Sequence, residues 1–325
     1  MQLSTSIVLP MVLHSAIELG VFDILSKADC SSDAAMMLDR ILKLLVSHSV
    51  LGCTAAADVD LGSFQRLYNL TPVSEYFVTN EDGVSLGPYM ALIQDQVFIR
   101  SWSQLYDAIL EGGTPFNRTY GTHPFKYLDL DPRFNKVFNA AMSNHTTIVI
   151  KKILESYKGF EQLRQLVDVG GGLGATINLI TTRYPNIKGI NFDLPHVIQH
   201  APPYPGVEHV EGDMFENIPE GHAIFMKWIL HSWSNEYCLK LLKNCYNAIP
   251  NDGKVIVVGA VIPTMPNIST SMKSTYQLDT FMMTQYTGGK ERTLEEIMAL
   301  ATMAGFSDIK FECSVCDLWV MEFFK

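Results

Sequence analysis

The hydrophobic pattern of the chain changes near its middle. Up to about residue 157, apolar residues recur mostly at helical spacing, and after Gly159 short apolar runs alternate with helical stretches. Alternating strands and helices are typical of a doubly wound, mostly parallel α/β sheet. The pattern therefore predicts a helical domain over residues 1–157 and an α/β domain over residues 158–325.

The first domain has four expected helical stretches, at residues 4–27, 36–50, 86–110 and 131–157. Pro10 interrupts the first of them and predicts a kink, because proline removes a backbone donor and clashes with the preceding turn. Two strand-like runs, at residues 66–70 and 76–78, predict a small β-ribbon. Helix, helix and ribbon together form a winged-helix-like pattern.

A winged helix that binds DNA needs a basic surface. The second helix here carries only Arg40 and Lys43, the ribbon carries Arg66 alone, and the formal net charge is -10. Nucleic acids and anionic membranes both attract basic patches, so neither is expected as a partner. We expect the apolar faces of this segment to form a homodimer interface.

The expected cellular location and metal content depend on three features: membrane helices, a signal peptide and cysteine pairs at zinc spacing. No apolar run approaches the roughly 18 residues of a membrane helix, and the first residues lack the basic region of a signal peptide. The expected location is therefore cytoplasmic. Cys313 and Cys316 form a C-x-x-C pair without a second pair at zinc spacing, so no metal is expected.

The second domain has predicted strands at residues 166–169, 188–192, 207–211, 223–227 and 254–258, followed by an antiparallel hairpin of residues 309–313 and 318–324. The first strand runs directly into Gly170, Gly172 and Gly174, and a helical pattern follows. This strand–loop–helix arrangement is the entry to a Rossmann-like nucleotide pocket, in which glycines let the backbone approach a ligand.

The glycine loop reads G-x-G-x-G, not the G-x-G-x-x-G of dinucleotide enzymes, and contains no Lys or Arg for a phosphate. Asp193 ends the next strand, where a carboxylate accepts ribose hydroxyls. Asp213 can accept an adenine amino group, with Met214 and Phe215 packed on the ring. These features favour S-adenosylmethionine, with S-adenosylhomocysteine as product. A nicotinamide cofactor, or a glycine turn with two surface aspartates, are the alternatives.

The fourth strand ends in Lys227 and Trp228, and His231 follows. Carboxyl ends of parallel strands face the ligand crevice, so His231 is expected beside the methyl donor, where it can accept a proton. Glu291 is the carboxylate expected to orient it. We expect Lys227 to face the cofactor and Trp228 the acceptor pocket. The alternative is a core histidine between two tryptophans.

The chain resembles the plant caffeic acid O-methyltransferase family over almost its whole length. The resemblance rests on residues 166–172, 191–197, 206–215, 225–231 and 288–293, while residues 45–48 and 313–325 are closer to the N-methylating branch, the anthranilate N-methyltransferases. It implies a homodimer in which each N-terminal segment completes the partner's pocket. It also implies donor contacts from Gly170, Asp193, Asp213, Met214 and Lys227, with His231 as proton acceptor.

The full set of expected site residues has three groups. The catalytic pair is His231 and Glu291. The cofactor-binding residues are Gly170, Gly172, Asp193, Leu194, Asp213, Met214, Phe215 and Lys227. The acceptor-binding residues are Phe134, Phe138, Met142, Trp228, Ser232, Gly259, Phe281, Met282 and Tyr286. The stripe of Phe134, Phe138 and Met142 on one helix face is either core or a pocket wall.

The chain departs from the O-methylating pattern at informative positions. Ser232 stands where that pattern has Asp, and Gly259 where it has Glu. Leu128 and Ile93 replace His and Asn, which makes the pocket more apolar. Between Lys27 and Met36 the chain is also about twenty residues shorter than that pattern.

The lost carboxylates favour nitrogen as the methyl acceptor. A phenol has a pKa of about 10 and needs a well-supported base before it attacks, whereas an arylamine attacks through its neutral lone pair. The predicted activity is therefore N-methylation of a small planar aromatic of the anthranilate, quinolone or acridone type in plant secondary metabolism. O-methylation of a caffeic acid-type or flavonoid phenol is the alternative, and an inactive S-adenosylmethionine-binding protein is a distant one.

Overall fold

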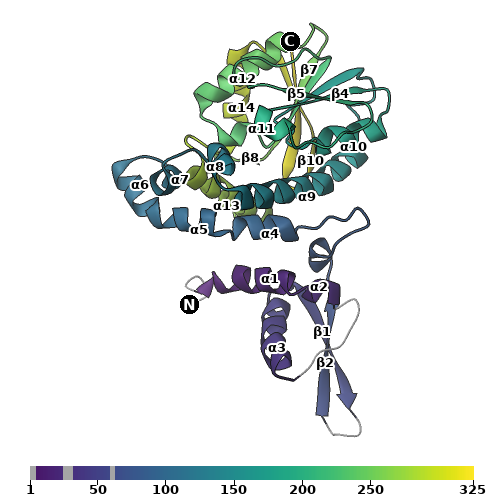
Figure 1. Cartoon of the computed structure of the whole chain (residues 1–325), viewed down its shortest axis with the longest axis vertical. Helices are drawn as coiled ribbons and strands as arrows, with labels where there is room; N and C mark the ends of the chain where they lie inside the picture. Colours follow the sequence, from purple (N-terminus) through teal and green to yellow (C-terminus); the bar gives the residue numbers. More distant parts are fainter. Residues whose placement is uncertain (1–4, 25–31, 59–62) are drawn as a thin grey trace. The chain divides into compact units, whose positions relative to one another are not determined.

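The computed structural model in Figure 1 describes residues 5–24, 32–58 and 63–325. The chain forms two compact units. The N-terminal unit comprises Met1–Gln96 with Ala140–His145, and the C-terminal unit comprises Val97–Asn139 with Thr146–Lys325. The shortened region between Lys27 and Met36 lies partly outside the described residues, which omit 25–31.

The N-terminal unit contains the expected helices and ribbon. Its elements are α1 (Val8–Glu18), α2 (Val21–Ile24), α3 (Ser32–Ser47), β1 (Leu51–Asp58), β2 (Ser63–Leu70), the 3₁₀ turn η2 (Ser74–Phe77) and α4 (Gly87–Ile93). Leu13, Phe22, Leu45 and Leu51 form its buried core. The amphipathic second helix, α3, is thus confirmed, and its apolar face packs against α1 and the ribbon.

Two predictions in this unit were wrong. Residues 76–78 are not a strand, because Ser74–Phe77 form a 3₁₀ turn, and β2 pairs instead with Leu51–Asp58. That partner strand was missed because its small residues lack strand propensity. Pro10 does not kink the first helix, because it lies in the first turn of α1, where proline is tolerated. The chain breaks at Gly20 instead, which has a φ of 65°.

The stretch predicted as one helix over 86–110 is a series of short ones. After α4 come α5 (Gln96–Ser101), the 3₁₀ turn η3 (Trp102–Gln104) and α6 (Leu105–Glu111). The first break falls where the amide of Asp95 bonds the carbonyl of Leu92, three residues earlier, and tightens the end of α4. Next follow α7 (Pro115–Tyr120), α8 (Pro124–Leu130) and the long α9 (Pro132–Ser156).

A seven-stranded sheet forms the centre of the C-terminal unit (Figure 1). Its strands are β3 (Gln165–Val169), β4 (Lys188–Asp193), β5 (Val207–Glu211), β6 (Ala223–Lys227), β7 (Lys254–Gly259), β10 (Asp308–Val315) and β11 (Leu318–Phe324). Their spatial order is β10-β11-β7-β6-β3-β4-β5. β11 runs antiparallel to both of its neighbours, β7 and β10, and the other neighbouring strands are parallel, so the predicted doubly wound sheet with a terminal hairpin is confirmed.

Helices cover both faces of this sheet. On one face α12 (Asn235–Ala248) and α14 (Leu294–Ala304) contribute Leu241, Cys245 and Leu300 to a core with Val167 and Ile224. On the other face α9 and α10 (Ala175–Arg183) supply a second core, which includes Ile150, Ile153, Ile177 and Ile180. The remaining elements are α11 (Pro195–Ile198), η4 (Leu230–Ser232), β8 (Val261–Ile262), α13 (Thr270–Gln285) and β9 (Arg292–Thr293).

The strand order has a switch point beside β3. Strand β3 pairs with β4 on one side and with β6 on the other, and all three run in parallel. In open α/β sheets ligands bind outside the carboxyl ends of the strands at such a point. The carboxyl ends of β3, β4 and β6 are followed by Gly170, Leu194 and Trp228, three of the predicted site residues.

Candidate active site

The glycine loop after β3 has the backbone that the sequence predicted. Gly170 and Gly172 adopt φ values of 68° and 59°, which L-residues with a side chain rarely take. At Gly172, the place of a Cβ atom has no atom of the described chain within 4 Å. The loop therefore presents bare backbone with open space at Gly172, as close approach of a ligand requires, whereas the Ile229 side chain packs against Gly170.

Asp193 is held against this loop. Its Oδ2 accepts the N–H of Gly172 at 2.8 Å, and its Oδ1 accepts the N–H of Leu194 at 2.7 Å. Burial raises the pKa of Asp193, while the two N–H donors act in the opposite direction. The carboxylate is thus fixed at the end of β4 beside Gly172, next to the open space.

The turn after β5 orders the next three predicted residues. Asp213 Oδ1 accepts the N–H of Phe215 at 2.8 Å, and Asn244 Nδ2 donates to the carbonyl of Met214 at 2.9 Å. Phe215 is buried edge-on against Trp233, with ring centroids 4.6 Å apart. The backbone at Asp213 and Met214 is consequently rigid on the same edge of the sheet as the glycine loop.

Asp168, which the sequence did not single out, lies on the same side of the sheet as the predicted cofactor residue Lys227. Both side chains lie on the α9 side of the sheet, because they continue the alternation of Leu166, Ala223 and Phe225. Burial raises the pKa of Asp168 to about 8 and lowers that of Lys227 to about 7. Asp168 lies within the apolar run of residues 166–169, which reads as a buried strand. The pattern alone therefore gave no reason to assign Asp168 a role in the site.

Asp168 also carries a polar atom without a protein partner. Its Oδ2 is buried and has no hydrogen bond within the described residues, whereas Lys227 Nζ donates to Thr146 Oγ1 at 3.1 Å. An unsatisfied buried acceptor beside a glycine cradle fits a ligand that brings donors. S-adenosylmethionine, which carries an ammonium group and ribose hydroxyls, fits these residues without a phosphate partner.

His231 and Glu291 meet as predicted. His231 Nδ1 lies 2.7 Å from Glu291 Oε1, and the two side chains are 9% and 3% exposed. Trp228 stacks on the imidazole at a centroid distance of 5.9 Å and has a φ of 58°, which is unusual for a bulky residue. The geometry orients one imidazole nitrogen on a carboxylate and leaves Nε2 for a proton.

The segment that carries Glu291 is joined to the segment that carries His231. Lys290 N donates to the carbonyl of His231 at 2.9 Å, and the Arg292 guanidinium donates to the carbonyls of Leu230 and Trp233 at 2.8 and 2.7 Å. These bonds hold the two short segments, which are about 60 residues apart in sequence, in one register.

An aromatic cluster adjoins this segment, and three of its members, His123, Phe125 and Trp233, were not among the expected site residues. His123 stacks on Trp233 with centroids 5.2 Å apart and an interplanar angle of 11°, and Phe125 lies 5.1 Å from Tyr286 and 6.2 Å from Phe138. Burial lowers the pKa of His123. The isolated His-Pro-Phe sequence at the start of α8 has no periodicity that would have marked it.

The other expected acceptor contacts are buried to different degrees. Phe134 and Phe281 both pack edge-on against Phe98, at 5.1 and 5.0 Å. Met282 and Ser232 are also buried. Met142 belongs to the segment that groups with the N-terminal unit, so its role stays a prediction.

Gly259 lies at the carboxyl end of β7, where Val258 pairs with Lys227 of β6. The place of a Cβ at Gly259 has no described atom within 4 Å. The position that carries Glu in the O-methylating pattern is therefore open space next to the strand that leads to His231.

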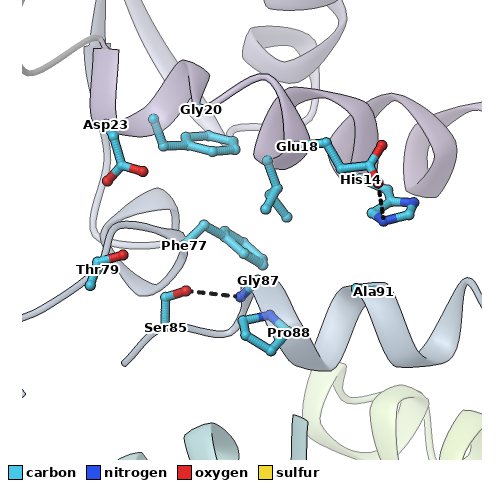
Figure 2. Close-up of a pocket in the computed structure, with 12 residues that line it drawn as sticks. His14, Glu18, Gly20, Asp23, Phe77, Thr79, Ser85, Gly87, Pro88 and Ala91 are labelled. Atoms are coloured by element: carbon cyan, nitrogen blue, oxygen red, sulfur yellow. Dashed lines mark hydrogen bonds and ion pairs between the residues drawn. The ribbon is translucent and has the colours of Figure 1, made fainter. Parts of the chain in front are cut away.

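A separate cavity lies within the N-terminal unit (Figure 2). It has a volume of about 360 Å³ and lies among α1, α2, η2 and the start of α4, lined by His14, Ile17, Glu18, Gly20, Phe22, Asp23, Phe77, Thr79, Ser85, Gly87, Pro88 and Ala91. None of the predicted site residues lines it. It is thus distinct from the glycine loop and the His231–Glu291 pair.

The described residues contain neither a membrane-spanning helix nor a cluster of metal ligands. Of the helices within residues 5–24, 32–58 and 63–325, none combines the length and apolar character needed to cross a membrane. In the same described ranges, no three His, Cys, Asp or Glu side chains are grouped so that they could hold a metal ion.

The family of the chain follows from comparison with known proteins. Residues 102–307 match the O-methyltransferase domain family, and residues 1–80 match the O-methyltransferase dimerisation domain. The chain belongs to the O-methyltransferase family. The predictions of a methyltransferase and of a methyltransferase fold with an N-terminal dimerisation domain are confirmed, and S-adenosylmethionine is confirmed as the donor at the level of the family.

The names of two curated relatives indicate different methyl-acceptor atoms, oxygen in one and nitrogen in the other. The chain is 54% identical to "Cathecol O-methyltransferase 1" of Solanum lycopersicum, with 100% of this chain and 94% of the relative covered. It is 52% identical to an anthranilate N-methyltransferase of Ruta graveolens, with 100% and 92% covered. The predicted resemblance to both branches is confirmed, and overall identity does not separate them.

Solved structures share the fold at low sequence identity. Human N-acetylserotonin methyltransferase in complex with SAM matches with a TM-score of 0.82 and 23% identity, covering 100% of this chain and 96% of that one. The SAH-bound form of CalO1 matches with a TM-score of 0.81 and 22% identity, covering 99% and 96%.

Proposed function

We propose that this chain transfers a methyl group from S-adenosylmethionine to a nitrogen atom of a small planar aromatic acceptor, with His231 as the general base. The observation that carries the choice of nitrogen is Gly259. It leaves open space beside the end of β6 where the O-methylating pattern supplies a carboxylate.

The donor is proposed to lie along the carboxyl ends of β3, β4 and β6. Gly170 and Gly172 provide bare backbone, Asp193 accepts the ribose hydroxyls, and Asp213 accepts the adenine amino group with Met214 and Phe215 against the ring. Leu194 and Lys227 border the same edge. When bound, the donor supplies an activated methyl group on a sulfonium centre and leaves as S-adenosylhomocysteine.

The acceptor nitrogen forms its bond to the methyl carbon as the carbon–sulfur bond breaks. The nitrogen then loses one proton, and His231 Nε2 is proposed to take it while Nδ1 stays on Glu291. Positioning of this kind is the main contribution a protein makes to a reaction with an activated donor. Since an arylamine attacks through a neutral lone pair, one supporting carboxylate suffices.

The acceptor is proposed to lie among aromatic and apolar side chains. Trp228, Ser232, Phe281, Met282 and Tyr286 come from the segments around the His231–Glu291 pair. Phe134 and Phe138 come from α9, and we add His123 and Phe125 because their rings lie against Trp233 and Tyr286. Flat rings stack favourably on such surfaces.

O-methylation of a phenol is the second candidate, because the His231–Glu291 contact of 2.7 Å is retained in full. This intact pair also disfavours an inactive donor-binding protein. The dimerisation domain supports a homodimer, and we propose that the N-terminal segment of each copy completes the partner's acceptor site.

The proposal is tested with two acceptor panels and S-adenosylmethionine as donor. One panel contains anthranilate, quinolone and acridone N–H acceptors, and the other contains caffeic acid-type phenols and flavonoids. Higher kcat/KM values for the N–H panel are expected. Preference for the phenols would transfer the assignment to O-methylation, and donor binding by calorimetry without turnover of either panel would support the inactive alternative.

A further inference from the structure

Asp279 contacts the segment that carries Glu291 from a third element. It lies on α13, on the helix face that also contains the buried residues Thr275 and Met282. Asp279 Oδ1 accepts the main-chain N–H of Glu291 at 2.8 Å. The sequence did not single out Asp279, because an acidic residue in the middle of a helix reads as a solvated position.

Glu291 is held from both sides of the chain as well as by Asp279. Lys290, which precedes it, donates its main-chain N–H to the carbonyl of His231, and Arg292, which follows it, donates a guanidinium N–H to the carbonyl of Leu230. Both contacts pull toward the His231 segment. Asp279 holds the amide of Glu291 itself, from α13.

Asp279 lies close to other charged side chains. Burial raises its pKa, with the nearby Glu291 and Glu296 acting in the same direction, whereas the Glu291 N–H and Lys290 oppose them. Lys290 Nζ is itself bonded to Glu296 Oε1 at 2.5 Å. The Glu291 N–H is thus the hydrogen-bond donor that satisfies an acceptor placed next to a like charge.

We propose that Asp279 is a positioning residue for the reaction: its carboxylate holds the main chain of Glu291 so that the Glu291 carboxylate stays on His231 Nδ1. This rests on the proposed function only in taking His231 as the base. Without the bond, the Glu291 main chain can move away from α13, and the carboxylate that orients the imidazole loses its fixed place.

The test observes the His231–Glu291 hydrogen bond directly. In protein labelled with ¹⁵N-histidine, an imidazole N–H bonded to a carboxylate gives a far-downfield proton resonance, which His231→Gln assigns by its disappearance. Asp279→Ala should abolish or broaden this resonance. Asp279→Asn, whose amide oxygen can accept the same N–H, should retain it. Asp252→Ala removes an exposed carboxylate elsewhere and serves as the matched control.

The effects of the Asp279 variants on kcat should rank in the same order as their effects on the downfield resonance. Asp279→Ala should lower kcat by about 10²-fold, the effect of misplacing a catalytic group by about 1 Å, with the KM for the donor changed less than about twofold, and Asp279→Asn should recover most of kcat. If Asp279→Ala does not fold, Asp279→Ser takes its place, since its shorter side chain cannot reach Glu291.

The outcomes separate this inference from the proposed function. A wild-type protein without the downfield resonance, or an Asp279→Ala variant that keeps it unchanged, overturns the role of Asp279. The resonance does not depend on turnover, so a failure to methylate nitrogen acceptors would sink the proposed acceptor and leave the test of Asp279 intact.

Discussion

Gly259 is the residue at which a single side chain should change the chemistry. Its Cβ position is open and its φ is not positive, so a longer side chain can be accommodated without strain. A carboxylate there would stabilise a protonated His231 during attack by a phenol. Gly259→Glu is therefore expected to raise kcat/KM for phenols by about 10-fold or more, within the range of base catalysis.

Gly259→Gln is the matched control for that substitution, because it adds nearly the same volume without the charge. Initial rates on one phenol and one arylamine measure the effect. Equal changes in the Glu and Gln variants would show that filling the space matters and the charge does not, which contradicts the account of this position.

The stability that Asp168 contributes to the folded protein should depend on pH. Burial raises its pKa to about 8 from a usual 3.8, so the folded state holds a proton that the unfolded state loses between these values. The stability from this group is fully present below about pH 4 and is lost as the pH rises through about 8. Asp168→Asn resembles the protonated form and should not show this loss.

The melting temperature of Asp168→Asn relative to the wild type should therefore rise steadily from pH 5 to pH 8, as measured by calorimetry. The exposed Asp252→Asn provides the baseline. A difference that does not vary with pH would mean that Asp168 is ionised in the folded protein throughout this range.

At the scale of elements, the start of α14 is expected to stabilise the site. Thr293 Oγ1 accepts the N–H of Glu296 at 3.3 Å, and Glu296 Oε2 accepts the N–H of Thr293 at 3.0 Å, which is a capping box. Thr293→Ala should lower the free energy of unfolding by about 1 kcal/mol, as measured by urea denaturation. Thr302→Ala, exposed within the same helix, should not lower it, and equal losses would exclude a role of the cap.

The elements also show which parts of the fold the sequence could predict. The central strands β3, β6 and β7 were found because each is a short run of mostly buried apolar residues between turns. β1 was missed because its alanines carry little strand signal, and only its pairing with β2 makes it a strand. The break between α4 and α5 depends on a local backbone bond at Asp95, which periodicity does not reveal.

The site could be predicted where chemistry is local and was missed where it depends on packing. The glycine loop, Asp193 and His231 follow strand ends, and Glu291 was nominated because a base needs a partner. Asp168, His123 and Asp279 acquire their surroundings from strands and helices distant in the chain. Periodicity alone assigns them to core, loop and surface.

At the scale of the whole molecule, the N-terminal unit should hold two copies together. Ile7, Val8, Met11 and Leu19 are large apolar side chains that remain exposed on and beside α1. Met11→Glu should place a charge in that interface and give a monomer in sedimentation velocity, while the wild type sediments at twice the chain mass. Met298→Glu, a similarly exposed methionine on α14, should remain a dimer. A dimeric Met11→Glu variant would place the interface elsewhere.

The most direct test of the acceptor atom uses one molecule that offers both choices. 3-Hydroxyanthranilate carries an arylamine and a phenol on the same ring, so both groups meet the same donor and the same His231. The products formed with S-adenosylmethionine are separated and identified by NMR. The account predicts the N-methyl product as the main one, and a main product methylated on oxygen would contradict it.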